Sequence, residues 1–220
     1  MEDASTVKAG DWFQLKRRET AAYQALRGSM AACKLEPVKV KTPTMNLNPS
    51  PALLGQVASL HLHPPFAGEP MEKVEMIEVI SGKGILGEPR YFSRRNRLNG
   101  QLSPRQISLI ERGQIAQHAS ALGLEKIAPG AVRANIETTG ASLISLLGHQ
   151  IQIGEAVLHL YEPRKPCEKM NAICAGLRSL MESNKQGVLA EVIQSGRIRV
   201  GDRISVAEKN CPSDAIFRAA

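Results

Sequence analysis

A single cysteine lies among prolines and basic side chains in the run Pro163-Arg164-Lys165-Pro166-Cys167-Glu168-Lys169-Met170. Proline fixes the backbone angle φ and lacks an N–H donor, so this run is neither the middle of a helix nor a central strand. Nearby positive charge favours the thiolate, the form of cysteine that acts as a nucleophile and as a metal ligand. Cys167 is therefore our candidate catalytic residue and metal ligand. The alternative is a loop cysteine without chemistry, next to a solvated basic surface.

Two elements flank this motif and decide where its cysteine projects. Residues 156–161 form an apolar run typical of a strand, and residues 171–181 have the pattern of a helix. We therefore expect Cys167 at the end of a strand, where side chains project into a cleft.

Basic residues are concentrated between residues 83 and 105, where six lysines and arginines accompany a single glutamate. This block forms either a solvated loop, as we expect for residues 94–99, or one wall of an anion-binding site. The net charge of +7 indicates an anionic partner such as a phosphate-bearing cofactor, a nucleic acid or a membrane surface. It does not distinguish among these three.

Short segments with period-two alternation dominate the chain from about residue 53. In residues 56–63 the alternation places His61 and His63 on one face, where we expect a structural or solvent-facing role rather than a metal site. The same patterns predict strands at 74–80 and 107–110, tight turns at 81–87, and a helix at 111–122 that ends at Gly123.

Two similar motifs predict hairpins. Residues 151–157 and 198–204 both have the order apolar, polar, apolar, glycine, acid, any residue, apolar. Glycine followed by an acid between alternating runs is typical of a type II′ turn. Together with the other short strands and only a few short helices, the two motifs predict a mostly β fold, a closed or nearly closed β-barrel.

The composition bounds the domain organisation. Hydrophobic residues make up 43% of the 220 residues and aromatic residues 4%, so the core is sizeable and mainly aliphatic. Prolines deny regular structure up to about residue 51. We therefore predict an N-terminal extension and linker at 1–52, with a short helix at 12–27, one β-barrel domain at 53–206, and a C-terminal tail at 207–220.

The sequence also bears on the compartment in which the protein resides. No apolar run is long enough to span a bilayer, and early acidic residues argue against a secretory or transit peptide. The four cysteines show no metal-site spacing, so we expect free thiols in a reducing compartment. These features predict a cytoplasmic protein.

The chain resembles the MOSC family, named for the C-terminal domain of molybdenum cofactor sulfurases. The resemblance covers about residues 55–206, and the order of its motifs makes it specific. The matching motifs are Gly84-Ile85-Leu86-Gly87, Arg105-Gln106-Ile107-Ser108-Leu109-Ile110, Pro129-Gly130 leading to Arg133-Ala134-Asn135-Ile136, Thr139-Gly140, Ile153-Gly154-Glu155, Pro163 to Cys167, and Gly187 followed by Gly196 to Asp202.

This resemblance implies a MOSC-type barrel that binds the molybdenum cofactor or handles sulfur for it. In members that hold the cofactor, the cysteine that matches Cys167 is the ligand to molybdenum, and the matches to Arg133 and Asn135 line the site. Because the cofactor, a pterin with a phosphate tail, is anionic and arginine forks suit phosphate and oxo groups, Arg105 and Arg164 are further candidates for binding it. Pyridoxal phosphate is not expected.

One departure from the family pattern concerns an acid–histidine pair. The family commonly has Gly-Asp-x-His near the first glycine turn, where this chain has Gly87-Glu88-Pro89-Arg90. The acid is lengthened and the histidine is displaced or lost. Glu88 is therefore only a weak candidate for the site, and Arg90 is a weaker candidate than the other arginines.

Three functions follow from these observations. The first is a molybdenum-dependent oxidoreductase that reduces N-hydroxylated small molecules, with electrons from an external partner because the sequence has neither iron–sulfur spacing nor a dinucleotide fingerprint. The second is a sulfur carrier with a persulfide on Cys167 for cofactor or metal-cluster maturation. The third is a basic nucleic-acid-binding module, although no specific nucleic acid is expected because stacking aromatic residues are scarce.

Overall fold

The computed structural model describes residues 53–207, which form a mostly β structure with two short α-helices. The strands are β1 (Leu53–Leu62), β2 (Glu72–Val74), β3 (Met76–Ile80), β4 (Gly84–Ile85), β5 (Ile107–Glu111), β6 (Ile136–Thr139), β7 (Gln150–Ile153), β8 (Ala156–Pro163), β9 (Val188–Gln194), β10 (Gly196–Arg199) and β11 (Arg203–Val206). The helical elements are α2 (Arg112–Ala121), α3 (Leu177–Leu180) and the 3₁₀ turns η1 (Leu143–Leu146) and η2 (Glu168–Met170).

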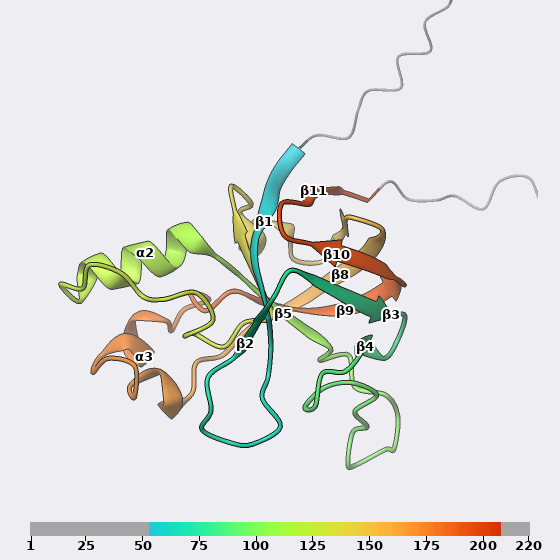
Figure 1. Cartoon of the computed structure of the whole chain (residues 1–220), viewed down its shortest axis with the longest axis horizontal. Coiled ribbons are helices and arrows are strands. Elements are labelled where there is room, and N and C mark those ends of the chain that lie inside the picture. The colour runs from blue at the N-terminus through green and yellow to red at the C-terminus, as the bar shows by residue number, and fades with distance from the viewer. Residues whose placement is uncertain (1–52, 208–220) are drawn as a thin grey trace, which may run out of the picture. The chain divides into compact units, whose positions relative to one another are not determined.

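Seven strands close into a barrel in the order β1, β11, β7, β8, β9, β5 and β6, and β6 pairs with β1. Neighbouring strands are antiparallel except β5 and β6, which are parallel and are joined through α2, because parallel strands need a long crossover connection. A smaller sheet has the order β10, β3, β4. The predicted closed barrel is confirmed (Figure 1).

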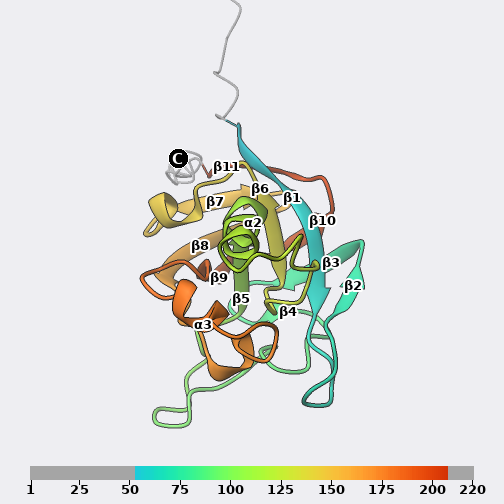
Figure 2. The ribbon, with the colours of Figure 1, turned by 90° about the vertical axis from the view of Figure 1, so that its left-hand side faces the viewer.

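Two apolar clusters follow from the strand patterns. The larger cluster fills the barrel, because alternate residues such as Ile151 and Ile153 of β7 point inward and are buried. A second cluster lies between the barrel wall and the helices α2 and α3, which cover one side of the barrel in Figures 1 and 2. Strand β5 serves both clusters: Leu109 belongs to the first and Ile110 to the second. Burial on both sides explains its unbroken apolar sequence.

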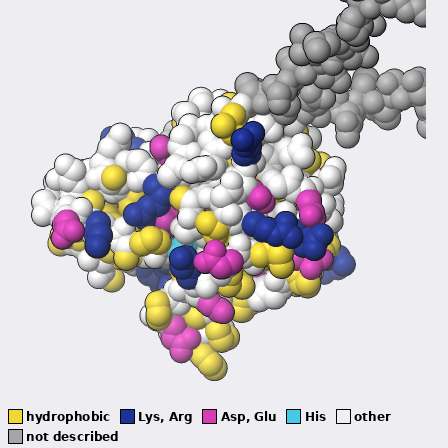
Figure 3. All heavy atoms as spheres, turned by 45° about the horizontal axis from the view of Figure 1, so that its top comes forward, with side chains coloured by type: hydrophobic (Ala, Val, Ile, Leu, Met, Phe, Trp, Pro, Cys, Tyr) yellow, Lys and Arg dark blue, Asp and Glu magenta, His cyan; other side chains and the backbone are white. Residues whose placement is uncertain are grey.

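Two long connections project beyond the same end of the barrel in both ribbon views. One joins β1 to β2, and the other joins β4 to β5 and carries most of the basic block (Figures 1 and 2). On the face shown in Figure 3, by contrast, basic and acidic side chains are interspersed.

Several local predictions are confirmed and others are wrong. The strands at β1 and β5 and the helix α2 lie where the patterns placed them. The turn at Gly154 joins paired strands β7 and β8, as predicted, and Gly154 has a φ of +56°. The similar motif at Gly201 is not a hairpin, because β10 pairs with β3 whereas β11 pairs with β1 and β7.

Two other segments are less regular than predicted. The predicted strand at 74–80 is divided into β2 and β3, and the predicted helix at 171–181 has α-helical geometry only at Leu177–Leu180. The predicted helix at 12–27 lies outside the described residues. No helix within residues 53–207 is long and apolar enough to cross a membrane.

Candidate functional site

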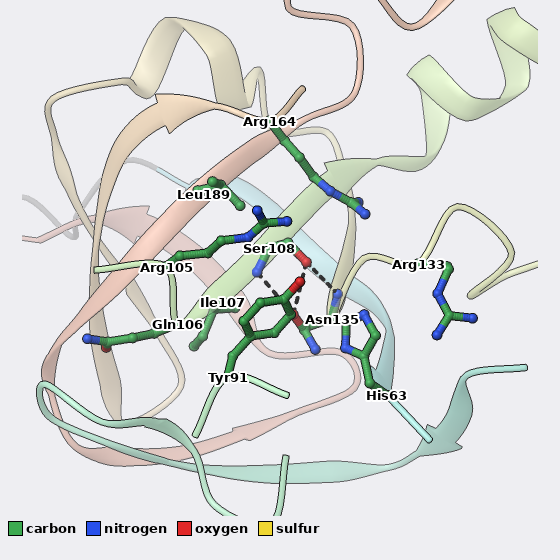
Figure 4. Close-up of a pocket in the computed structure, with 10 residues that line it drawn as sticks. All are labelled: His63, Tyr91, Arg105, Gln106, Ile107, Ser108, Arg133, Asn135, Arg164 and Leu189. Carbon is green, nitrogen blue, oxygen red and sulfur yellow. Dashed lines mark hydrogen bonds between the residues drawn. The ribbon is translucent and has the colours of Figure 1, made fainter. Parts of the chain in front are cut away.

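A pocket lies where β1 and β8 end and where β5 and β9 begin (Figure 4). It is lined by His63, Tyr91, Arg105, Gln106, Ile107, Ser108, Arg133, Asn135, Arg164 and Leu189. The guanidinium groups of Arg105 and Arg164 lie on one side, Tyr91 reaches in from another, and His63 and Arg133 occupy the remaining side. Four candidates from the sequence therefore meet at one place: Arg105, Arg133, Asn135 and Arg164.

Arg133 is held in an unusual conformation at this pocket. Its φ is +59°, in the left-handed region that is costly for a residue with a Cβ. The backbone at Arg133 is therefore not extended, although both Arg133 and Asn135 border the pocket. Nη1 of Arg133 donates to the carbonyl of Glu69 (2.9 Å), whereas Nε and Nη2 are buried without a partner among the described residues.

Arg164 is anchored from two directions. Its N–H donates to the carbonyl of Gly187 (2.9 Å), and Nη1 donates to the carbonyl of Val132 (3.2 Å). Gly187 must be glycine, because its φ is +81° and a Cβ would collide with the backbone of β5. Burial lowers the pKa of Arg164 to about 10, and the neighbouring Arg105 acts in the same direction. The pocket thus concentrates positive charge that an anion would neutralise.

Tyr91 forms an aromatic centre for the pocket. The guanidinium carbon of Arg105 lies 5.1 Å from the centroid of its ring, and that of Arg94 lies 5.6 Å away. The imidazole of His63 meets the ring of Tyr91 edge-on, with centroids 5.4 Å apart. Both arginines are within the distance at which a cation is attracted to an aromatic face. No sequence pattern indicated Tyr91, apart from its place after the glycine turn.

Glu88 is a buried hydrogen-bond acceptor behind the pocket, with 2% of its surface exposed. Oε2 accepts hydrogen bonds from the backbone N–H of His63 (2.9 Å) and from Nδ2 of Asn135 (3.2 Å), and Oε1 accepts from the N–H of Arg90 (3.1 Å). Nδ1 of His63 lies 3.2 Å from Oε1. Burial works to raise the pKa of Glu88, but the contacts with His63 outweigh it and leave the pKa lowered.

The acid–histidine pair missing from the local sequence is therefore formed across the fold. His63, at the end of β1, contacts Glu88 from a segment 25 residues away. We expected a structural or solvent-facing role for His61 and His63; the solvent-facing alternative is wrong, because they are 2% and 5% exposed, and the structural one agrees with their buried contacts. The alternation correctly placed the two rings on one face, but that face is covered.

Asn135 is fully buried and its side chain is already engaged. Oδ1 accepts from the N–H and the hydroxyl of Ser108, and Nδ2 donates to the carbonyl of His61 and to Glu88. These bonds tie together β1, β5 and the turn that bears Glu88. Asn135 thus frames the pocket from behind.

A second buried network holds the segment that carries Arg133. Glu137 accepts hydrogen bonds from Arg112 (3.0 Å), from the hydroxyl of Ser59 (3.1 Å) and from the N–H of Gly130 (2.8 Å). Nε2 of His61 lies 3.0 Å from the hydroxyl of Ser59. Burial lowers the pKa of His61, which keeps the imidazole neutral, although the charge of Glu137 opposes this shift.

Cys167 lies beside the pocket rather than in its wall. It is exposed and free, four residues beyond the end of β8 and immediately before η2. A negative charge on Cys167 raises the pKa of both Arg133 and Arg164, although burial is the dominant effect on each and lowers it. The predicted proximity of this thiol to basic residues therefore agrees with the structure, but the cleft at the strand end is formed by other side chains.

The described residues thus define a closed β-barrel protein with an arginine-lined pocket next to an exposed thiol. A family model for the MOSC domain matches residues 90–205. Because this match covers more than half of the chain, the protein belongs to the MOSC family. The search of curated proteins found no match.

Several solved structures have a fold similar to that of this chain. YuaD from Bacillus subtilis has a TM-score of 0.57 at 18% identity, with 68% of this chain and 93% of that chain covered. YiiM from Escherichia coli has a TM-score of 0.51 at 18% identity, with 70% of each chain covered. YiiM from Geobacillus stearothermophilus has a TM-score of 0.50 at 17% identity, with 73% and 76% covered. At these identities the likeness establishes the barrel fold alone.

Proposed function

We propose that this MOSC protein binds the molybdenum cofactor, with Cys167 as the ligand to the metal, and reduces N-hydroxylated small molecules. The observation that carries the proposal is the convergence of Arg105, Arg133 and Arg164 on one pocket, beside which Cys167 is exposed. A soft thiolate suits a metal that is already held by sulfur. The three arginines suit the anionic phosphate tail of the pterin.

The hydrogen-bonding state of Arg133 supports the fit of such a group. Nε and Nη2 of Arg133 are buried and have no partner among the residues described. Leaving buried donors unpaired costs free energy, about 1–3 kcal/mol each and more for charged groups. An anionic group that accepted from this edge of the guanidinium would remove that cost, and would also offset the lowered pKa of Arg164.

Each residue of the pocket has a distinct task under this proposal. Arg133 and Arg164 bind the anionic parts of the cofactor through paired N–H donors. Arg105, which is exposed above Tyr91, covers the mouth of the pocket. Asn135 and Glu88 fix the surrounding backbone rather than touching the cofactor, because their polar atoms are already bonded. When bound, the cofactor supplies the two-electron redox chemistry, with electrons from an external electron-transfer protein.

Metal content tests this proposal directly. The full chain, purified from a host that makes the molybdenum cofactor, is expected to contain about one molybdenum per chain by elemental analysis, in keeping with a single thiolate ligand. Arg133→Ala should lower this metal content, and Arg95→Ala is its matched control. Arg95 lies in the exposed loop, and within residues 53–207 its side chain bonds only the carbonyl of Gly100. Metal-free protein from such a host would contradict cofactor binding.

The exposure of Cys167 supports a second candidate function, a sulfur carrier. A thiol outside the pocket wall can meet a partner protein and carry a persulfide to it. Intact mass of native protein separates the two candidates. A mass increase of one sulfur atom on the Cys167 peptide, without bound molybdenum, favours the carrier, whereas molybdenum without a persulfide favours the reductase.

A further inference from the structure

The buried pair of His63 and Glu88 has the arrangement of an oriented proton donor. Glu88 receives three hydrogen bonds, from the backbone of His63 and Arg90 and from the side chain of Asn135, so the carboxylate cannot rotate freely. Its pKa is lowered, which keeps it ionised. A carboxylate held at ion-pair distance from one nitrogen of an imidazole favours the ring orientation in which that nitrogen carries a proton.

The orientation of the ring leaves its other nitrogen for the pocket. Nδ1 of His63 lies 3.2 Å from Oε1 of Glu88. Glu88 is not part of the pocket wall, whereas His63 is, and its ring borders the space between Tyr91 and Arg133 (Figure 4). Nε2 makes no hydrogen bond to any residue within 53–207. In the protonated ring this nitrogen bears an N–H that faces the pocket.

We infer that His63, oriented by Glu88, donates the proton that converts the departing hydroxyl group of an N-hydroxylated substrate into water. The inference rests on the proposed reductase function. The substrate R–NH–OH gains two electrons from the external electron-transfer protein, and its N–O bond breaks. The departing oxygen takes one proton from Nε2 of His63 and leaves as water, while the nitrogen takes a second proton from solvent to give R–NH₂. Solvent then returns a proton to His63.

Other pocket groups are less suited to this transfer. The three arginines hold their protons too tightly to act as acids near neutral pH, even with the pKa of Arg164 at about 10. The hydroxyl of Ser108 is engaged with Asn135. Tyr91 contacts His63 edge-on and limits the tilt of its ring, so we assign it a positioning role.

Substitution of His63 by glutamine tests the inference in the full chain loaded with cofactor. With reduced methyl viologen as electron donor and a hydroxylamine R–NH–OH as substrate, kcat is expected to fall about 100-fold, the size of a typical general-acid contribution, with KM changed less than about threefold. Molybdenum content and the melting temperature serve as controls in the same samples. His149→Gln is a matched control, because His149 is exposed and is not among the residues that line the pocket.

The outcomes separate this inference from the proposed function. If loaded wild-type protein reduces no N-hydroxylated substrate, the proposed function fails and the inference fails with it. If the wild type is active and H63Q keeps more than half of its kcat, the inference alone fails. Loss of molybdenum from H63Q would also overturn it, because His63 would then act in binding the cofactor.

A chemical measurement on the wild type covers the case in which H63Q does not fold. Diethyl pyrocarbonate modifies imidazole nitrogens that solvent can reach. Peptide mass spectrometry is expected to find His63 modified in cofactor-free protein, and modified at least tenfold more slowly once the protein is loaded. His61, two residues earlier in β1, is 2% exposed and should stay unmodified. An unreactive His63 in a sample where His149 reacts would overturn the inference.

Discussion

At the scale of single residues, the arginines of the pocket should differ sharply from those of the exposed loop. Within residues 53–207, Arg133 has two buried guanidinium nitrogens without a partner, whereas the side chain of the exposed Arg95 bonds only the carbonyl of Gly100. Loss of a charge-assisted contact costs about 2 kcal/mol, against less than 1 kcal/mol for a solvated charge. Arg133→Ala should therefore weaken cofactor binding about 30-fold and Arg95→Ala less than about fivefold.

Cofactor retention measured by dialysis against increasing volumes of buffer checks this difference. A melting curve for each variant shows whether the loss comes from unfolding. Equal losses from both variants would remove Arg133 from the site and leave its left-handed backbone without a role in binding.

Under the proposed function, Cys167→Ser should abolish reductase activity and leave the fold intact. Serine is nearly the same size, but its hydroxyl stays protonated near neutral pH and is a hard, poor ligand for this metal. Cys167 is exposed, so the melting temperature should change little. Cys174→Ser is the control, because Cys174 packs against the apolar cluster under the helices. Full activity in the Cys167 variant would exclude both the ligand and the persulfide roles.

The residues of the pocket were predictable only where chemistry and local sequence agree. Arg105, Arg133 and Arg164 lie in distinct family motifs, and their positive charge indicated an anion site. His63 and Tyr91 could not be paired from sequence, because their contact joins the end of β1 to the loop after β4. The burial of Glu88 could not be predicted either, since an acid after a glycine turn is usually solvated. Glu88 is buried only because the folded barrel encloses its side chain.

At the scale of elements, the segment between α2 and β6 depends on a neutral histidine. Glu137 accepts a hydrogen bond from the N–H of Gly130, and the ring of His61 packs against the same glycine. Arg112 donates to the carbonyl of Ile127 (3.2 Å). This network keeps the turn in place from which Arg133 projects. Protonation of His61 would place a buried cation next to the partly buried guanidinium of Arg112, and burial already lowers the pKa of His61.

The stability of the domain should therefore fall below the pKa of an unfolded histidine, 6.5. Between pH 6.5 and the lowered pKa, His61 is protonated in the unfolded chain but neutral in the folded chain. The free energy of unfolding therefore decreases as pH falls through this range. One such group contributes a slope of up to about 1.4 kcal/mol per pH unit. Urea unfolding between pH 7.5 and 5.5 should show this slope, and His61→Gln should reduce it.

His149→Gln provides the comparison, because an exposed imidazole should leave the slope unchanged. The chosen range lies above the titration of Glu88, whose lowered pKa affects stability only at more acidic pH. An unaltered slope in His61→Gln would mean that the folded and unfolded states hold this histidine alike.

The two glycine–acid motifs show what an element's sequence can and cannot determine. Both have a glycine with positive φ, +56° at Gly154 and +88° at Gly201, as their sequence requires. Their partners differ: β7 and β8 pair across the first turn, whereas β10 joins the small sheet and β11 enters the barrel. Local sequence determines the turn, but the choice of partner strand depends on which edge is left open by the rest of the barrel.

At the scale of the whole molecule, closure of the barrel depends on the two ends of the described chain. β11 pairs with both β1 and β7, and Leu53 lies opposite Ser205 at the junction. The N–H of Ala207 donates to the carbonyl of Gln150 (2.9 Å), which fixes the last described residue to β7. A barrel that lost β11 would expose two unpaired strand edges and one face of its core.

Truncation before β1 should therefore leave the barrel stable, whereas truncation before β11 should disrupt it. A chain that begins at Pro51 keeps every strand, so its melting temperature should stay within a few degrees of that of the full chain, as expected if residues 53–206 are one cooperative domain. A chain that ends at Asp202 lacks β11, loses the buried Ile204 and opens the barrel, so it should aggregate or bind hydrophobic dyes. Circular dichroism melts and gel filtration of both chains provide the comparison. If the chain from Pro51 is insoluble or melts without cooperativity, the boundary near residue 52 is wrong, and residues before it contribute to the stability of the barrel.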